Sequence, residues 1–511
     1  MRANGVDGAH LQICRDRACR LEVTAFDAVD SGTPSSDLPA GVLFWRAFAQ
    51  RQGVTSSAAS WTWEVTVGAR SAPVDTSWGT TLDVNGDGMA DVLVSAPDAD
   101  TRGEVALYLG RAGGPATSPT LVLPSPQGSA GYFGTFVASA GDVNGDGFGD
   151  AIISDSDGAY VFLGGPAGLA SAPAVTLTRP PSLPPQGSSD FGIHVASAGD
   201  VNGDGYADVA VGDNVAGQVF VFLGGVAGPS ASADFTLKDP SAPPPNNDSY
   251  GHSVEGAGDV NGDGYADVAV GANGAAGAAG QVYLYWGGPT GLASTPAVTV
   301  TGPDADSGGF GRLSCAGDVN GDGYADLAVG SDGAGTSLAG RAYIYLGGPA
   351  GYAASPDVAL DSPDGAGALF GRLVAGAGDV NGDGYADLII GADAEIVQVA
   401  GPDGGVSGPA GWAHVYLGST AGLATSPAAT LVGPDGPSTW FGRSVAGPGD
   451  VDGDGYDDVL VGAPAEETNQ PGFAHLYFGD AVGLSPSRST TFTGPSSASH
   501  FGLSVASVLV R

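Results

Sequence analysis

Short runs of alternating apolar and small or polar residues recur along most of the chain, and glycine or proline bounds each run. Residues 207–212 read A-D-V-A-V-G, residues 218–225 read Q-V-F-V-F-L-G-G, and residues 296–300 read P-A-V-T-V. Alternation with a period of two residues is the pattern of a β-strand, and no apolar stripe with a helical period is visible. The pattern therefore predicts an all-β chain.

These runs fall into repeating units of four predicted strands. The first strand follows an aromatic-glycine pair, as in F-G-T-F-V-A-S-A-G-D at 133–142, and the other three follow between Gly-Gly and Gly-Pro turns. A sheet of four short strands does not bury both faces alone, but stacking such sheets around an axis does. The repeat thus predicts a β-propeller with four antiparallel strands per blade, its aromatic side chains filling the layers between blades.

A nine-residue acidic loop separates the first and second predicted strands of each unit. The first copy is D-V-N-G-D-G-M-A-D at 83–91. Six further copies begin at Asp142, Asp200, Asp259, Asp318, Asp379 and Asp450. The intervals are 59, 58, 59, 59, 61 and 71 residues, so the chain is a tandem array with one loop per unit. Seven loops predict seven blades.

The two ends of the array predict a closed ring. Units two to seven place the aromatic-glycine pair eight or nine residues before the loop, whereas Trp78-Gly79 lies only five residues before Asp83. Residues 501–511, F-G-L-S-V-A-S-V-L-V-R, read as a first strand with no loop after it. We expect residues 501–510 to complete the first blade of a propeller that spans 71–511; an abandoned eighth repeat is the alternative.

The acidic loop has the donor pattern of a calcium site. Side-chain oxygens at positions 1, 3, 5 and 9 and the carbonyl at position 7 offer the six or seven hard ligands that Ca²⁺ takes. Histidine and cysteine, which softer metals prefer, are absent from all seven loops. The glycines, such as Gly203 and Gly205, permit turns that other residues resist. The alternative, an Asx-rich turn without metal, would leave three carboxylates in each loop to repel one another.

We therefore predict up to seven bound Ca²⁺, one per loop. The predicted ligands are Asp83, Asn85, Asp87, Met89 and Asp91; Asp142, Asn144, Asp146, Phe148 and Asp150; Asp200, Asn202, Asp204, Tyr206 and Asp208; Asp259, Asn261, Asp263, Tyr265 and Asp267; Asp318, Asn320, Asp322, Tyr324 and Asp326; Asp379, Asn381, Asp383, Tyr385 and Asp387; and Asp450, Asp452, Asp454, Tyr456 and Asp458.

The charge balance narrows the classes of partner. The formal net charge is −38 and Lys238 is the only lysine, so no basic patch for nucleic acid or an anionic membrane is visible. The four side-chain ligand positions of the loops contain 22 aspartates, so seven Ca²⁺ would bring the charge to −24. No apolar run approaches the roughly 20 residues of a membrane span.

Residues 1–70 differ from the repeats. Strand runs at 21–28, 41–50 and 61–67 predict part of a β-sandwich, which needs about seven strands where four or five fit. This shortfall, and a start without the apolar core of a signal peptide, led us to expect that Met1 is not the true N-terminus. Cys14 and Cys19 have a spacing compatible with a hairpin disulfide or with two thiols. Cys315 is expected to be a small core residue.

The repeat consensus F-G…G-D-V-N-G-D-G-Y-x-D-(V/L)-x-V-G-A, followed by V-Y-x-(Y/F)-L-G, resembles the FG-GAP repeat of integrin alpha-subunit propellers and of bacterial surface proteins. The match covers roughly residues 74–511. The resemblance implies a seven-bladed propeller with Ca²⁺ between the first two strands of blades. In integrins only some blades bear the loop, whereas here every blade does. Residues 1–70 look like the end of a fibronectin-type-III-like sandwich.

We therefore predict a non-enzymatic, extracellular or cell-surface module that binds a protein or glycan ligand. The alternative is the propeller scaffold or accessory domain of a secreted glycan- or lipid-cleaving enzyme, as some FG-GAP-like propellers are; a third is a passive segment of a longer protein. A cluster of Arg, His or Tyr at one face of the ring, beside a spare Ca²⁺, would favour the enzyme. No catalytic or organic-cofactor residue is predicted, and the oligomeric state is left open.

Three features outside the loops carry expectations of their own. An insertion around Val397–Trp412 predicts a protruding hairpin, which is either a binding loop or a tolerated insertion. His414 and His475 occupy the same third-strand position in neighbouring repeats, so packing or surface roles are expected. The spare acids Asp155, Asp157, Asp213, Glu466 and Glu467 are expected to be solvated loop charges.

Overall fold

A computed structural model describes the fold. The described residues are 8–14, 22–28, 41–51, 54–59, 63–67, 82–127, 131–156, 158–180, 190–241, 248–304, 308–335, 337–393, 399–400, 406–407, 411–436, 439–465, 470–496 and 499–506. Among them, no helix is long and apolar enough to cross a membrane. Nearly all regular structure is β, with one helical turn, α1 (Ala275–Ala278), and one 3-10 turn (Ala99–Thr101).

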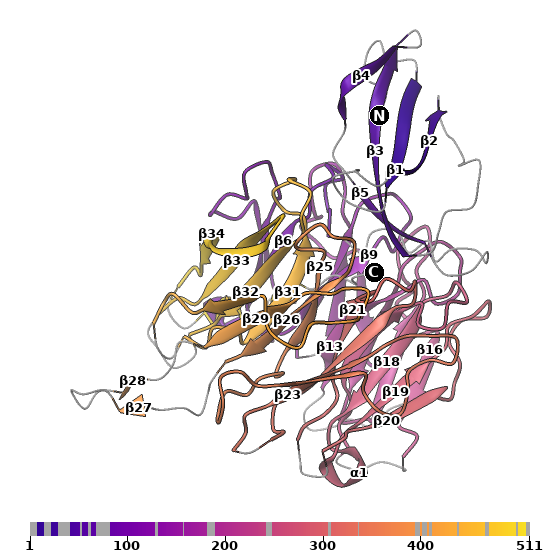
Figure 1. The fold of residues 1–511 in the computed structure, drawn as a ribbon. Coiled ribbons are helices and arrows are strands. Elements are labelled where there is room, and N and C mark those ends of the chain that lie inside the picture. The colour runs from indigo at the N-terminus through magenta and orange to yellow at the C-terminus, as the bar shows by residue number, and fades with distance from the viewer. Residues whose placement is uncertain are drawn as a thin grey trace.

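The N-terminal region forms one antiparallel sheet of five strands (Figure 1). Its strands are β1 (Gly8–Cys14), β2 (Glu22–Ala28), β3 (Gly41–Arg51), β4 (Val54–Ala59) and β5 (Trp63–Val67). The order is β2-β1-β3-β4, and β5 pairs with β3 with Trp45 opposite Trp63. The described residues supply a single layer, so the sandwich and its fibronectin-like character stay predictions. Cys14 is disulfide-bonded, and Cys19 lies outside the described residues.

The repeats form seven sheets, six with four strands and one with three. Each sheet follows chain order from an inner to an outer strand, except where the insertion adds a small hairpin. The strands are β6 (Val92–Ala96), β7 (Glu104–Tyr108), β8 (Leu121–Pro124); β9 (Val137–Gly141), β10 (Asp150–Ser154), β11 (Gly158–Phe162), β12 (Val175–Thr178); β13 (Phe191–Gly199), β14 (Asp208–Asp213), β15 (Gln218–Phe222), β16 (Phe235–Lys238); β17 (Tyr250–Gly258), β18 (Asp267–Ala272), β19 (Gln281–Tyr285), β20 (Val298–Thr301); β21 (Arg312–Gly317), β22 (Asp326–Ser331), β23 (Arg341–Tyr345), β24 (Val358–Asp361); β25 (Val374–Gly378), β26 (Asp387–Ala392), β29 (Trp412–Tyr416), β30 (Ala429–Val432); and β31 (Ser444–Gly449), β32 (Asp458–Ala463), β33 (Phe473–Asp480), β34 (Gly483–Thr493). The fold is the predicted all-β, seven-bladed propeller. We number the blades one to seven in this order.

Burial follows the position of a strand within its blade. Second strands such as β14 and β18 are buried along their whole length, because both faces pack against neighbouring blades. Fourth strands such as β16 bury one residue in four, which marks the outer rim. Seven apolar clusters each join two adjacent blades, and one of them joins blades seven and one. The core therefore lies in the layers between blades.

The aromatic of each aromatic-glycine pair fills these layers. Phe133 packs edge-on against Tyr160 with ring centroids 5.8 Å apart, and Phe310 packs against Tyr343 at 5.7 Å. Cys315 is buried and is not disulfide-bonded, as expected of a small core residue. The alternation of apolar residues along the first and third strands thus supplies the packing between blades.

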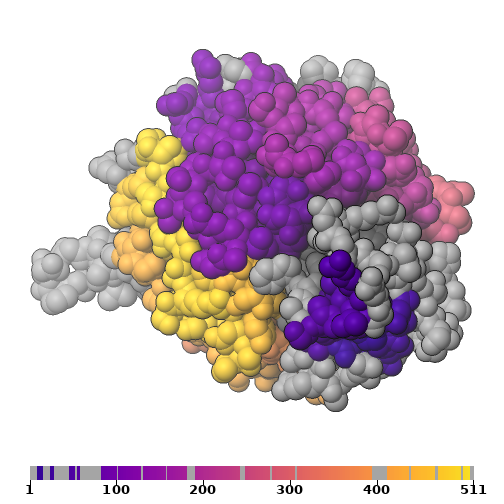
Figure 2. Space-filling view, turned by 90° about the horizontal axis from the view of Figure 1, so that it is seen from above, coloured from indigo at the N-terminus to yellow at the C-terminus, as the bar shows by residue number. Residues whose placement is uncertain are grey.

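The three-stranded first blade has the C-terminal segment beside β6. Ser95 donates its N–H to the carbonyl of Ser504 at 3.0 Å, and Gly502 donates to the carbonyl of Ser95 at 2.9 Å. An antiparallel bridge joins Val94 to Val505. In Figure 2 the last blade, in yellow, lies against the first blade, in purple. Trp78-Gly79 and residues 507–511 lie outside the described residues.

The insertion of unit six forms the two short strands β27 (Val399–Ala400) and β28 (Val406–Ser407), which pair antiparallel. They lie away from the blades, at the lower left of Figure 1. The predicted protruding hairpin is thus present in these residues.

Candidate metal centre

The first aspartate of each acidic loop organises the backbone around itself. In the loop at 318–326, Asp318 Oδ1 accepts the N–H groups of Gly321 and Asp322 at 2.7 and 3.0 Å, and its Oδ2 accepts that of Gly323 at 2.8 Å. These bonds fold the loop tightly, and both glycines have positive φ angles, 73° and 90°. The chain can make this turn because glycine adopts such angles without steric cost.

The residues at positions 3 and 5 form hydrogen bonds with each other beside that aspartate. In the same loop the amide of Asn320 donates to Asp322 Oδ2 at 3.0 Å, and Asn320 Oδ1 accepts the N–H of Asp322 at 2.8 Å. Asp322 Oδ1 accepts the N–H of Tyr324 at 3.1 Å. The structure therefore brings side-chain oxygens of positions 1, 3 and 5 into one small loop, as the spacing predicts.

The aspartate at position 9 has a structural role that the sequence did not reveal. Asp326 is fully buried, its Oδ2 accepts the N–H of Val319 at 2.9 Å, and its Oδ1 accepts that of Gly347 at 2.8 Å. All seven position-9 aspartates bind two backbone N–H groups in this way. Each one fastens the loop to the end of the third strand, and its direct contact with a cation stays a prediction.

The seven loops are joined head to tail in a closed circle. The residue at position 8 of each loop donates its N–H to the position-1 carbonyl of the preceding loop, as Ala386 does to Asp318 at 3.1 Å. The circle closes where Ala90 of the first loop donates to Asp450 of the last at 2.9 Å. One end of the propeller axis is therefore ringed by seven acidic loops.

Glycine at position 4 makes room for the neighbouring loop. A Cβ on Gly321 would lie 2.7 Å from the ring of Tyr385, the position-7 aromatic of the next loop. The same contact recurs between Gly86 and Phe148 and between Gly203 and Tyr265. Position 4 therefore requires glycine both for its φ angle and for the aromatic ring that packs on it.

The electrostatics of the loops fit a bound divalent cation. Burial, with a smaller contribution from the nearby loop carboxylates, raises the pKa of Asp91 to about 8, of Asp150 to about 7 and of Asp208 to about 8. Burial also raises the pKa of Asp259 and of Asp318 to about 6. A cation within the loop would offset both the burial and the repulsion.

One buried oxygen supports the same fit. Asn261 Oδ1, at position 3 of the fourth loop, is buried and has no hydrogen-bond partner. An amide oxygen in this state costs free energy unless a donor or a cation meets it. The donor set of carboxylate, amide and carbonyl oxygens is that of calcium, so the residues present fit the predicted ion.

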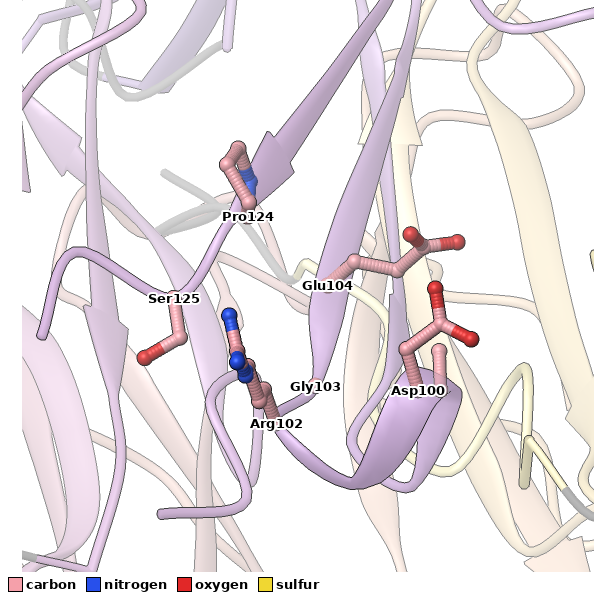
Figure 3. Close-up of a pocket in the computed structure, with 7 residues that line it drawn as sticks. Asp100, Arg102, Gly103, Glu104, Pro124 and Ser125 are labelled. Carbon is pink, nitrogen blue, oxygen red and sulfur yellow. The ribbon is translucent and has the colours of Figure 1, made fainter. Parts of the chain in front are cut away.

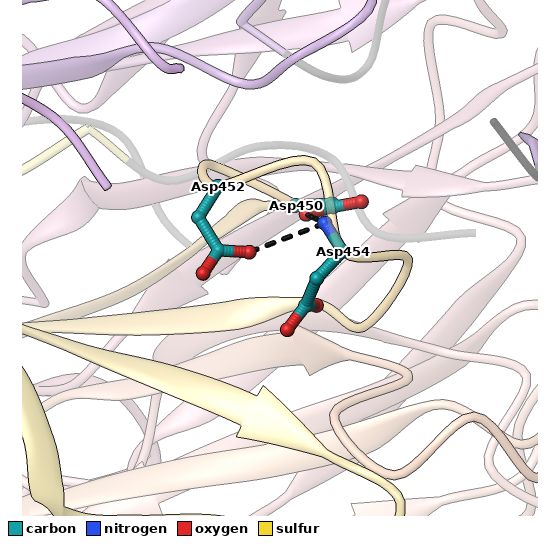
Figure 4. Close-up of side chains that lie close together, drawn as sticks. All are labelled: Asp450, Asp452 and Asp454. Carbon is teal, nitrogen blue, oxygen red and sulfur yellow. Dashed lines mark hydrogen bonds between the residues drawn. The ribbon is translucent and has the colours of Figure 1, made fainter. Parts of the chain in front are cut away.

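The seventh loop departs from the other six. Asp450, Asp452 and Asp454 bring carboxylate oxygens within 4.8 Å of one another (Figure 4). Arg488 donates from one guanidinium nitrogen to Asp452 Oδ2 at 2.5 Å and to Asp454 Oδ2 at 2.8 Å. Sequence reasoning missed this arginine, because it comes from the fourth strand of the blade, β34.

The histidines at equivalent positions of the third strands are packing residues, as expected. His414 and His475 are each 1% exposed, and their Nε2 atoms lie 2.6 Å from Asp364 Oδ2 and 2.7 Å from Asp435 Oδ2. Each aspartate follows the outer strand of the preceding blade. These pairs therefore link neighbouring blades.

Two of the spare acids were wrongly expected to be solvated. Asp155 is 4% exposed and accepts the hydroxyl of Tyr160 at 2.8 Å. Asp213 is fully buried and pairs with Arg179 at 2.7 Å. Their partners lie on other segments, which explains why the local sequence misled. Asp157, Glu466 and Glu467 lie outside the described residues.

A polar hollow of about 380 Å³ lies at the rim of blade one (Figure 3). Arg102 and Ser125 lie on one side of it, and the carboxylates of Asp100 and Glu104 lie together on the other. Burial, and then Asp100, raises the pKa of Glu104. The described lining residues include two carboxylates and no histidine or cysteine.

The axis of the ring contains a second cavity, of about 350 Å³, lined by the first strands of the blades. Arg312, Arg372 and Arg443, with His194 and His252, converge on it. This grouping was missed, although the sequence carries its signal: arginine follows the Phe-Gly pair in three successive units. It has the residue types that were expected to favour an enzyme beside a spare Ca²⁺, but its lining contains none of the predicted calcium ligands.

Comparisons with known proteins agree with this geometry. A model of the FG-GAP repeat matches residues 191–222, 250–285, 310–345, 370–407 and 441–477, and a model of an FG-GAP-like repeat matches 83–153. Together they bracket the seven loops from Asp83 to Asp458.

Curated relatives include three integrin alpha subunits. Mouse integrin alpha-IIb is 41% identical over 157 residues, 28% of this chain and 15% of that protein. Rat integrin alpha-7 is 35% identical over 175 residues, 34% of this chain and 14% of that protein. Integrin alpha-PS5 of Drosophila melanogaster is 34% identical over 150 residues, 27% of this chain and 15% of that protein. The match thus spans about one seventh of these relatives.

Among solved structures, the Dos1 propeller shares 11% identity, covers 68% of each chain and superposes with a TM-score of 0.36. At this TM-score the likeness carries no argument about function, and the fold rests on the sheets described above.

Proposed function

Because the chain carries FG-GAP repeats and forms an integrin-alpha-like β-propeller, we propose that it is an extracellular, calcium-binding recognition module for a protein or glycan ligand. The observation that carries the proposal is the closed circle of seven loops, each of which gathers aspartate oxygens beside a buried position-9 carboxylate. Calcium in the loops would supply positive charge and no chemistry of its own. The proposed role is therefore structural at the loops and non-catalytic overall.

The loops support recognition by holding the blades in register. Each position-9 aspartate joins a loop to the third strand of its own blade, and each position-8 N–H joins that loop to the preceding blade. A cation that stabilises the loop would therefore stabilise both connections. Rigid blades in turn hold the connecting segments of the ring in fixed positions, where ligand-binding residues of such folds commonly lie.

The recognition half of the proposal is tested with protein and glycan arrays. The full chain is applied in 2 mM Ca²⁺, roughly the concentration at which extracellular modules bind the ion, and again in excess chelator. We expect ligand signal in Ca²⁺ that is lost in chelator. A variant without residues 397–411 tests the protruding hairpin, and unchanged binding by that variant would remove it as the site.

The enzyme alternative has one observation in its favour, the arginine and histidine cluster on the axis. Turnover of a polysaccharide or lipid by the full chain, abolished by Arg372→Gln and unaffected by Arg341→Gln, would establish it over the binding role. We expect no turnover, because the described lining of the cavity holds no serine, cysteine or tyrosine paired with a base.

A further inference from the structure

Six of the seven acidic loops contain an Asn-Gly pair at positions 3 and 4, and the seventh has Asp452 at position 3 instead. The six asparagines are Asn85, Asn144, Asn202, Asn261, Asn320 and Asn381. Asparagine before glycine loses ammonia readily, because glycine has no side chain to hinder the attack of its own nitrogen on the neighbouring amide carbon. Position 3 of these loops is therefore a place where the chain can modify itself.

The nitrogen that would attack is already hydrogen-bonded to a carboxylate. Gly203 donates its N–H to Asp200 Oδ1 at 2.7 Å, and the equivalent bond in four other loops has the same length. A general base has to lie within about 2.6–3.2 Å of the atom whose proton it removes. The position-1 carboxylate meets this requirement, and the proton that it holds is the one that has to leave before nitrogen bonds to carbon.

The asparagine side chain is held beside that nitrogen. Asn202 Oδ1 accepts the N–H of Asp204 at 2.9 Å, which closes an Asx turn around the intervening Gly203. Asn202 Nδ2 donates to Asp204 Oδ2, also at 2.9 Å. The amide carbon therefore lies in the same turn as the glycine nitrogen, and the leaving nitrogen is hydrogen-bonded to a second carboxylate.

We propose that the calcium-free loops deamidate themselves at position 3. In the third loop, Asp200 accepts the proton of the Gly203 N–H, and this nitrogen forms a bond to Cγ of Asn202. The Cγ–Nδ2 bond breaks, and ammonia leaves with the proton that Asp200 returns. Water then opens the succinimide, so the net reaction converts an amide and one water into a carboxylate side chain, as aspartate or isoaspartate, and ammonia.

Calcium should protect the loops, and this part of the inference rests on the proposed calcium binding. The predicted ligands include the side-chain oxygens of Asp200 and Asn202. A cation held by these oxygens would compete for the carboxylate that accepts the proton and would restrain the amide. The deamidation step itself needs no calcium. Position 3 would thus record how long the chain has been without the ion.

The seventh loop already carries the residue that this reaction would produce. Asp452 accepts a hydrogen bond from Arg488 Nη2 at 2.5 Å. In the third loop the Asn202 amide is itself the donor to Asp204, so hydrolysis would remove this hydrogen bond and set two carboxylates against each other. Each modified loop is therefore expected to be less stable without calcium than the loop from which it formed.

The pair Asn273-Gly274 supplies an internal control. It is the same dipeptide outside the loops, directly before α1, and Gly274 donates its N–H to the backbone carbonyl of Asp248 at 3.0 Å. A peptide carbonyl is a far weaker base than a carboxylate. This pair therefore keeps the chemistry of the dipeptide and lacks the base.

Exposure should set the order of rates among the loops. The position-4 residues Gly86, Gly145 and Gly203 are exposed, whereas Gly262 is buried. Water has to reach the succinimide to open it. Asn261, which precedes the buried glycine, should therefore be converted to the acid most slowly of the six.

The test follows each asparagine of the full chain by peptide mapping with mass spectrometry. The chain is incubated at neutral pH in excess chelator and, in parallel, in about 2 mM Ca²⁺. General-base catalysis typically contributes about 10²-fold or more, so Asn202 should deamidate at least about tenfold faster than Asn273 in chelator. Equal rates at these two asparagines in chelator would overturn the proposal without the need for any variant.

Asp200→Asn tests the assignment of the base. The substitution removes the carboxylate and keeps an oxygen that can accept the N–H of Gly203, so Asn202 should deamidate at least about tenfold more slowly in chelator. Asn144, in the neighbouring loop, should keep its wild-type rate in the same sample. An unchanged or faster rate at Asn202 would overturn the role of Asp200.

The melting temperature of the same samples separates the two proposals. If calcium raises the melting temperature and leaves the rate at Asn202 unchanged, protection by the ion is overturned. If calcium changes neither, the calcium proposal fails, and a faster reaction at Asn202 than at Asn273 in chelator still supports self-modification.

Discussion

The loop at 318–326 and the loop at 450–458 solve one electrostatic problem in two ways. In the former, the amide of Asn320 donates to Asp322 Oδ2 at 3.0 Å. In the latter, position 3 is Asp452, which has no proton to donate, and Arg488 donates to Asp454 Oδ2 at 2.8 Å instead. An oxygen that a neighbouring amide satisfies in six loops needs a cationic side chain in the seventh, because that loop has a fourth carboxylate.

The surroundings of the seventh loop have changed to supply that side chain. The strands β33 and β34 are longer than the third and fourth strands of other blades, and β34 carries Arg488 across to the loop. Position 8, which is alanine or glycine elsewhere, is Asp457, and its Oδ2 accepts the N–H of Asp379 in the preceding loop at 2.8 Å. A cation entering this loop has to displace a guanidinium group, so its affinity should be the lowest of the seven.

Calcium removal is expected to have the largest effect. A ligand at ten times its Kd adds about 1.4 kcal/mol per site to the free energy of unfolding, or about 8 kcal/mol for six sites. The unfolding entropy of a chain of 511 residues is about 1 kcal/mol/K, so chelator should lower the melting temperature by roughly 8 °C in differential scanning calorimetry. An unchanged melting curve in excess chelator would show that calcium does not stabilise the fold. The two kinds of loop would then differ only in their hydrogen bonds.

Position 9 should matter equally in both kinds of loop. Asp326→Ala and Asp458→Ala each leave two buried N–H groups unpaired, at roughly 1–3 kcal/mol per group, so a loss of about 3 kcal/mol is expected from both in urea unfolding with chelator present. Asp361→Ala is the control, because Asp361 is 79% exposed. A large loss of stability in Asp326→Ala with none in Asp458→Ala would show that the two loops also differ in how their position-9 aspartates hold the backbone.

A carboxylate in this fold meets an amide donor at Asp322 and a guanidinium group at Asp454. Glu255 shows a third case, in which the carboxylate is neutralised by a proton. Its pKa is raised by burial from 4.5 to about 8, so between these pH values the folded chain keeps a proton that the unfolded chain has lost. Stability should therefore fall as pH rises through this window. Glu255→Gln removes the effect, and at 1.36 kcal/mol per pKa unit over about 3.5 units we expect the variant to be roughly 5 kcal/mol more stable than wild type at pH 8.5 and equal to it at pH 4.

The stability of each protein alone does not report Glu255, because His194 and His252 change stability with pH in the opposite direction. The difference between Glu255→Gln and wild type isolates the contribution of Glu255. The lowered pKa values of the two histidines make the folded state more stable as pH rises from the lowered pKa to 6.5, and this gain is complete above 6.5. Both proteins carry these histidines, so their contribution cancels in the difference. A difference that does not change between pH 4 and pH 8.5 would mean that Glu255 is ionised in the fold.

Arg488→Gln should have the smallest effect on the free energy of unfolding, and it tests the comparison between the two loops most specifically. Arg488 is 40% exposed, so its loss should cost about 1 kcal/mol in chelator. In saturating Ca²⁺ the cost should vanish, because the ion then meets the same oxygens. Arg341→Gln, also exposed and paired with two carboxylates, should show the same cost in both conditions, and identical behaviour of the two variants would break the comparison.

Much of the fold was predictable because it is repeated. The spacing of the loops sets the seven blades, and glycine at position 4, as at Gly321, follows from a turn written in every unit. The packing of His414 and His475 between blades also agrees with their repeated position. The spacing of Cys14 and Cys19 left both a disulfide and two thiols open, and the structure shows Cys14 to be disulfide-bonded.

The rest depends on contacts between distant segments. The bond from Gly347 to Asp326 and the reach of Arg488 to Asp454 join residues 21 and 34 positions apart. Burial of Asp213 has the same origin, since Arg179 lies 34 positions away. Asp155 differs, because its partner Tyr160 lies only five positions away, on the next strand. Convergence of three arginines on the axis required both the period and the ring, and neither alone points to it.

The most direct test of the central claim is a count of bound ions by native mass spectrometry during a calcium titration. We predict six Ca²⁺ bound in a first phase and a seventh at higher concentration, with the phases merged in Arg488→Gln and one ion fewer in Asp204→Ala. No bound calcium at millimolar concentration, or a count that Asp204→Ala does not change, would contradict the assignment of the acidic loops as calcium sites.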